Sequence, residues 1–113
     1  MNPLHRIADT IDYNIYIAGD YELAQEIAQR YCDEKGFCVT VSHTKYVYSF
    51  GKEEGVIVGL INYPRFPKQQ EELRDHALAL ATQLKTELKQ ESFSIQGPDK
   101  TEWFSWREGD IGG

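Results

Sequence analysis

Hydrophobic residues recur along the chain with two periods, and these periods divide it into strands and helices. Residues 13–17 alternate between two faces, which is the pattern of an extended strand. Residues 21–34 and 67–88 carry apolar side chains at spacings of three and four, which predicts two amphipathic helices. Asp20 is placed to cap the first helix, and Gly36 is placed to end it in a left-handed conformation.

The same patterns predict further strands in the middle of the chain and near its end. These expected strands are residues 37–43, 45–50, 56–62, 92–96 and 101–107. Residues 51–55 have a glycine at each end and predict a hairpin loop. Residues 62–67 contain two prolines, which cannot donate to a ladder, and predict a rigid extended connector.

The resulting order of elements is β-α-β-β-β-α-β-β, which predicts an α+β fold. We expect a mostly antiparallel sheet of about six strands with two helices packed on one face. One ligand-binding domain is expected over residues 13–107, after an arm or short helical turn at 1–12 and before a frayed tail at 108–113.

Two helices can cover only one face of such a sheet, so the second face is expected to be exposed. Aromatic side chains on an exposed face indicate a contact surface, from which we expect a homo-oligomer. The aromatic residues from which this face would be drawn are Tyr46, Tyr48, Phe50, Trp103 and Phe104 or Trp106.

Composition narrows the classes of partner. The 12 Lys and Arg residues are outnumbered by 18 Asp and Glu residues, which gives a net charge of −6. That balance argues against long nucleic acids as general partners, although a few local cations can still bind one small anion. The longest apolar run, residues 56–61, is too short to span a membrane. With no leader sequence recognisable, the expected location is the cytoplasm.

Motifs for catalysis and for metal binding are missing from the sequence. It contains neither a phosphate-binding P-loop nor a G-x-S-x-G nucleophile motif. The three histidines lack metal-binding spacing, and Cys32 and Cys38 are too far apart for a C-x-x-C pair. We therefore expect no metal, no cofactor and no catalytic residues, so that the protein is not an enzyme.

One segment is suited to binding an anion, namely residues 62–68 just before the second helix. Arg65 offers a planar guanidinium for phosphate oxygens, and Asn62 can read the edge of a base or ribose. Phe66 can stack on a base, although on composition alone the segment is better explained as a stiff linker with Phe66 in the core. The other residues expected to contact a ligand are Tyr46, Tyr48, Trp103 and Arg107.

Four runs of sequence resemble a known family. They are Tyr16-Ile17-Ala18-Gly19-Asp20, Gly36 to Val41, Gly55 to Pro67 and Lys100-Thr101-Glu102-Trp103. Together these runs, within residues 13–107, are similar to the first type of phage Thoeris anti-defence protein. The longest run is the specific one, and it contains Asn62, Arg65 and Phe66.

The resemblance implies a phage-encoded inhibitor of bacterial immunity. Such a protein binds cyclic ADP-ribose isomers made by TIR-domain enzymes and sequesters them without cleaving them. It implies a dimer, assembling to a hexamer in some members, and cyclic oligonucleotides as possible further ligands. Two alternatives stay open: a small enzyme that cleaves cyclic nucleotide signals, and an interaction module that blocks a host protein.

Overall fold

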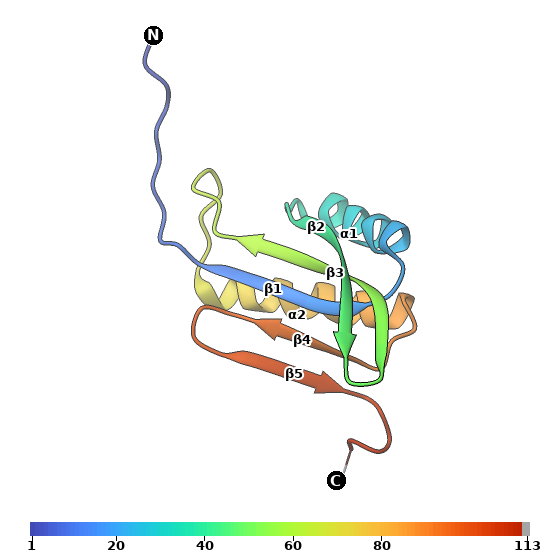
Figure 1. Cartoon of the computed structure of the whole chain (residues 1–113). Helices are drawn as coiled ribbons and strands as arrows, with labels where there is room; N and C mark the ends of the chain where they lie inside the picture. The colour runs from blue at the N-terminus through green and yellow to red at the C-terminus, as the bar shows by residue number, and fades with distance from the viewer. Residues whose placement is uncertain (112–113) are drawn as a thin grey trace.

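The computed structural model describes residues 1–111 and contains one sheet covered by two helices (Figure 1). The elements are β1 (Asp12–Ala18), α1 (Tyr21–Lys35), β2 (Thr40–Tyr48), β3 (Gly51–Ile61), α2 (Gln70–Glu87), β4 (Ser92–Gln96) and β5 (Thr101–Ser105). The strands lie in the order β2-β3-β1-β4-β5, and every neighbouring pair is antiparallel. The first six elements form a βαββαβ motif of the ferredoxin-like type, and β5 extends it at one edge.

The predicted α+β class is confirmed, but the sheet has five strands instead of six. Two strands were expected over residues 37–43 and 45–50. The structure instead has one continuous strand there, β2, with no turn at residue 44. Residues 51–55 are likewise strand and not loop, because β2 pairs with β3 from Thr40 opposite Gly59 to Tyr48 opposite Gly51. The hairpin turn falls at residues 49–50, where Phe50 has a φ of 69°.

The hydrophobic core lies between the sheet and the two helices. Alternate residues of β1, β3 and β4 point into it, as Ile15 beside Val58 and Ile95 illustrates. The apolar stripes of α1 and α2 cover these residues, and Leu80 is among the side chains with no solvent exposure. Burying one such side chain contributes about 1.5–3 kcal/mol, so this layer accounts for most of the driving force for folding.

The ends of α1 follow the sequence prediction. The Asp20 carboxylate accepts a hydrogen bond from the backbone N–H of Leu23 at 2.8 Å, and such caps contribute about 1 kcal/mol. Gly36 ends the helix with a φ of 64°, and its N–H donates to the carbonyl of Cys32 at 2.8 Å.

The segment before α2 differs from the expected extended connector. It bends in a turn that the N–H of Phe66 closes by donating to the carbonyl of Tyr63 at 2.8 Å. Helix α2 therefore begins only at Gln70, three residues later than Pro67 would suggest.

Residues 1–11 form neither helix nor strand and extend away from the sheet (Figure 1). The buried side chain of Asn62 fixes the base of this arm. Its Nδ2 donates to the carbonyl of Asp9 at 2.9 Å, and its Oδ1 accepts from the N–H of Lys68 at 2.8 Å. At the other end of the chain, residues 107–111 make a turn, and residues 112–113 of the expected tail lie outside the described residues. Within residues 1–111 no helix is both long and apolar enough to cross a membrane.

His76 joins the two helices through a partly buried contact. Its Nδ1 lies 2.6 Å from the Tyr31 hydroxyl, and the ring of Phe37 stacks on the imidazole with centroids 4.3 Å apart. Burial lowers the pKa of His76, and the nearby Lys68 lowers it further. The imidazole is therefore neutral in the folded protein over a wider pH range than in the unfolded chain.

This histidine predicts a loss of stability in mild acid. Between the two pKa values the unfolded state binds more protons, so the free energy of unfolding falls as the pH drops below about 6.5. Urea unfolding of wild type and His76→Gln at pH 7.5 and pH 5 would measure it. The variant should be about 1 kcal/mol less stable at pH 7.5, since it loses a hydrogen bond, and the gap should narrow at pH 5. Parallel pH profiles for the two proteins would contradict this account.

Candidate functional site

The sheet face opposite the helices contains an open hollow of about 230 Å³. It lies where the β2–β3 hairpin, the end of β1, the start of β4 and the end of β5 come together. The lining residues that matter for its chemistry are Tyr16, Tyr46, Glu53, Ser94, Trp103 and Arg107. Ligand pockets usually measure about 300–1,000 Å³, so this hollow suits a nucleoside better than a dinucleotide.

Tyr46 forms one wall of the hollow, and the lack of a side chain at Gly55 leaves room for its ring. Its hydroxyl donates to the carbonyl of Val56 at 2.6 Å, and burial raises its pKa to about 12, so the phenol is neutral near pH 7. Its ring lies against Gly55, where an added Cβ would be 2.3 Å from the ring and 2.7 Å from the carbonyl oxygen of Ile17. A side chain at position 55 would therefore displace Tyr46.

The opposite wall is built by two aromatic residues with a small residue between them. Tyr16 pairs with Ser94 across β1 and β4, and Ser94 pairs with Trp103 across β4 and β5. Because residues directly opposite share a face, the serine leaves space beside the two rings. The indole of Trp103 is 59% exposed, so it is available to stack on a planar ligand.

An ion pair on the helix side fixes β5, the strand that carries Trp103. Arg74 on α2 holds the carboxylate of Glu102 through two hydrogen bonds, at 3.0 and 2.7 Å. This pairing lowers the pKa of Glu102. The bidentate geometry anchors the edge strand β5 to α2 and thereby positions Trp103, the residue after Glu102, in the hollow.

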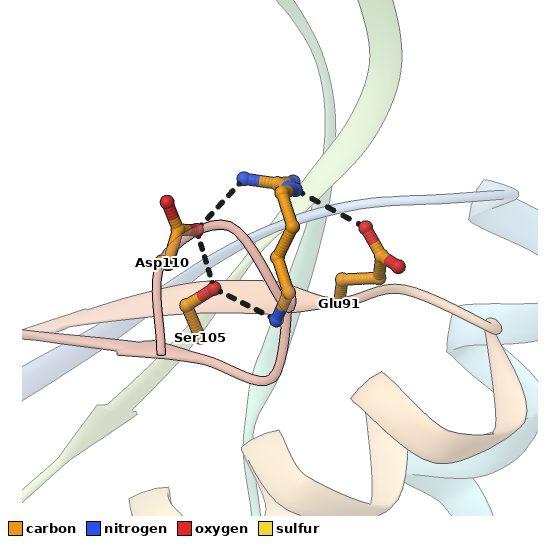
Figure 2. Close-up of polar contacts among 4 residues, drawn as sticks. Glu91, Ser105 and Asp110 are labelled. Atoms are coloured by element: carbon orange, nitrogen blue, oxygen red, sulfur yellow. Dashed lines mark hydrogen bonds and ion pairs between the residues drawn. The ribbon is translucent and has the colours of Figure 1, made fainter. Parts of the chain in front are cut away.

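The charges around the hollow are predominantly negative. Arg107 is its cation, but the guanidinium is paired with Glu91 at 3.1 Å and with Asp110 at 3.2 Å (Figure 2). Glu53 adds a third carboxylate, and it makes no ion pair among residues 1–111. Partial burial and this carboxylate together raise the pKa of the neighbouring Tyr48. One guanidinium and three carboxylates leave the site with a net negative charge.

The structure divides the predicted ligand-binding residues between two places. Tyr46, Trp103 and Arg107 line the hollow, and Tyr48 lies on the same face nearer the hairpin turn.

Asn62, Arg65 and Phe66 lie beyond the opposite ends of β1 and β3, about 20 Å of strand away. Both polar atoms of the Asn62 amide are used inside the protein. Arg65 lies 5.2 Å from the Phe66 ring centroid, and Phe66 is exposed and not part of the core.

Sequence reasoning missed Tyr16, Glu53 and Ser94. The signal that identifies the face was present as three glycines four residues apart, at positions 51, 55 and 59. Even spacing places all three on one face of β3, and side chains of β2 lie over each of them. Two of these side chains are the rings of Tyr48 and Tyr46, so the glycines mark where these rings pack against the sheet.

Within residues 1–111, no three His, Cys, Asp or Glu side chains gather closely enough to hold a metal ion. The lining of the hollow also contains neither histidine nor cysteine. What it offers instead is aromatic surface, hydroxyl groups and carboxylates.

Comparison with known proteins identifies relatives by fold only. No protein-family model and no curated protein sequence matches this chain. A phage SAM lyase in its apo state matches with a TM-score of 0.69 and 16% identity, covering 95% of this chain and 100% of that one. A phage SAM lyase in complex with S-methyl-5'-thioadenosine matches with a TM-score of 0.67 and 13% identity over the same shares. At these identities the likeness shows a common fold.

This comparison corrects one expectation and leaves others as predictions. The expectation that the protein is not an enzyme is overturned, because the structures that share its fold over 95% of the chain are lyases. A Thoeris signal sponge in particular is not confirmed, although the shared fold is that of a phage protein that binds a small nucleoside. The homo-oligomer, the cyclic ADP-ribose ligand and the cyclic oligonucleotides stay predictions.

Proposed function

We propose that this protein is a small lyase that binds S-adenosylmethionine, a sulfonium nucleoside, in the hollow on the open sheet face. The observation that carries the proposal is the combination of aromatic walls, of which Trp103 is exposed, with the carboxylate of Glu53, which makes no ion pair among residues 1–111. Aromatic faces stack on adenine, and both aromatic faces and carboxylates attract a sulfonium cation. The fold shared with phage SAM lyases supports the same ligand class.

The charge of the site favours this ligand over a cyclic ADP-ribose isomer. Such an isomer carries two phosphates, and three carboxylates around the hollow would repel them. S-adenosylmethionine instead carries a positive sulfur, which is attracted by the same carboxylates. Its single carboxylate is the only anionic group that the site has to tolerate.

The reaction requires little from the protein chemically. When the bond between sulfur and the amino-acid carbon breaks, its electron pair stays on sulfur, and neutral methylthioadenosine leaves. The carbon takes its new bond from the carboxylate oxygen of the same ligand, which closes a cyclic ester. Neither water nor a protein nucleophile is needed, in keeping with a hollow lined by no cysteine or histidine. The protein contributes the orientation of the ligand.

Incubating the protein with S-adenosylmethionine and analysing the products by chromatography tests the proposal. We expect methylthioadenosine to form, and Trp103→Ala to weaken ligand binding about 5- to 150-fold through lost stacking. Arg65→Ala is the matched control, since Arg65 lies outside the hollow, and it should react like wild type. Intact S-adenosylmethionine after incubation would contradict the proposal. A cyclic ADP-ribose isomer recovered bound and uncleaved would contradict it as well.

A further inference from the structure

Arg107 is the one residue of the hollow whose usual partners are phosphates, yet two of the N–H donors of its guanidinium are already paired with carboxylates. Its Nε donates to Glu91 Oε2 at 3.1 Å, and a terminal nitrogen donates to Asp110 Oδ2 at 3.2 Å (Figure 2). The two carboxylates come from different segments, one just before β4 and the other in the turn after β5. The guanidinium is therefore held from two sides.

The turn after β5 keeps Asp110 in place independently of the ion pair. The Ser105 hydroxyl donates to Asp110 Oδ2 at 2.6 Å, and the N–H of Asp110 donates to the carbonyl of Arg107 at 2.9 Å. The N–H of Arg107 in turn donates to the Ser105 hydroxyl oxygen at 3.1 Å. An isolated exposed ion pair contributes little, but a carboxylate fixed by such a network loses less entropy on pairing.

The consequence falls on the ligand. An unpaired arginine beside aromatic rings binds phosphate in a bidentate manner. At Arg107 an incoming phosphate would share the guanidinium with two carboxylates that repel it, while Glu53 adds repulsion from across the hollow. A ligand without phosphate meets none of these costs.

We infer that Glu91 and Asp110 set the ligand specificity of the hollow. By neutralising Arg107 and repelling phosphate they select against phosphate-bearing nucleotides and in favour of neutral and cationic adenine nucleosides. The inference rests on the proposed function, because it concerns the ligand class of the same site. It assigns to two residues outside the lining of the hollow the choice between nucleosides and nucleotides.

Two ligands that share adenosine and differ at the 5' position test this directly. Methylthioadenosine and 5'-AMP are titrated calorimetrically into wild type, Glu91→Gln, Asp110→Asn and the double variant. Wild type should prefer methylthioadenosine at least tenfold, and each single variant should shift the ratio toward AMP by about tenfold. Asparagine at 110 can still accept from Ser105, so the turn should persist, which unfolding curves would check.

Glu71→Gln is the charge-matched control, since it removes one carboxylate from the first turn of α2 and should leave the ratio unchanged. Ratios within twofold of wild type in Glu91→Gln, Asp110→Asn and the double variant would overturn the inference. So would a wild-type preference for AMP.

Inorganic pyrophosphate separates this inference from the proposed function. It should bind the double variant but not wild type, and adding Arg107→Gln should abolish that binding. If no nucleoside binds wild type while pyrophosphate follows this pattern, the proposed function fails and the role of the two carboxylates stands. If pyrophosphate does not bind the double variant, the inferred role of Glu91 and Asp110 is wrong, even where methylthioadenosine binds.

Discussion

Replacing Gly55 with alanine is expected to abolish nucleoside binding and to lower the free energy of unfolding by about 1–3 kcal/mol. The added Cβ would lie 2.3 Å from the Tyr46 ring and 2.7 Å from the carbonyl oxygen of Ile17. The ring can move away, but the carbonyl belongs to β1 in the centre of the sheet and cannot. Tyr46 then leaves its position, and the β1–β3 pairing is strained.

Calorimetric titration with methylthioadenosine and urea unfolding would measure the two effects. Gly109→Ala provides the control, because a Cβ at position 109 meets nothing within 4 Å. If Gly55→Ala binds methylthioadenosine as wild type does, then Tyr46 does not form a wall of the ligand site.

Exchanging Glu53 for glutamine is expected to weaken S-adenosylmethionine binding about tenfold and to change methylthioadenosine binding less than twofold. Only the first ligand carries the sulfonium charge that the carboxylate attracts. That charge disappears as the carbon–sulfur bond breaks, so Glu53 stabilises the bound substrate more than the transition state. The KM should therefore rise while kcat does not fall.

The adjacent carboxylate gives a closely matched control for this experiment. Glu54 is the next residue of β3, points to the other face and pairs with His43 and Lys45. Glu54→Gln removes the same charge and should leave both affinities unchanged. Equal losses of both ligands in Glu53→Gln would show that Glu53 acts through packing and not through charge.

Local signals predicted the elements of this protein well where one physical cause dominates. Asp20 and Gly36 bounded α1 because capping depends only on residues close in sequence. The loop expected at residues 51–55 was wrong for the opposite reason. Glycines there suggest a loop, but they lie in β3 because side chains of β2 pack over them. That pairing is a tertiary contact, which periodicity within one segment does not contain.

The candidate site was harder to predict than the fold. The alternation of side chains along the strands predicted aromatic residues of the exposed face, and two of them, Tyr46 and Trp103, line the hollow. Arg65 was favoured because it stands beside prolines and a helix start, which are conspicuous in sequence. The cluster of Arg107, Glu91 and Asp110 forms only because β5 folds back along β4. Pairing with two carboxylates changes the local net charge from positive to negative, which the arginine alone does not indicate.

Strand β5 has a further consequence for how such a protein can diversify. The βαββαβ motif is complete at Gln96, and everything after it is an addition at one edge of the sheet. That addition supplies Trp103, Arg107 and Asp110, while the motif supplies Tyr16, Tyr46, Glu53 and Ser94. Part of the chemistry of the candidate site thus lies outside the motif that forms the core. Substitutions at exposed positions of the addition, such as Trp103 and Arg107, are expected to alter what is recognised, whereas Phe104, which packs against the core, is expected to be needed for folding.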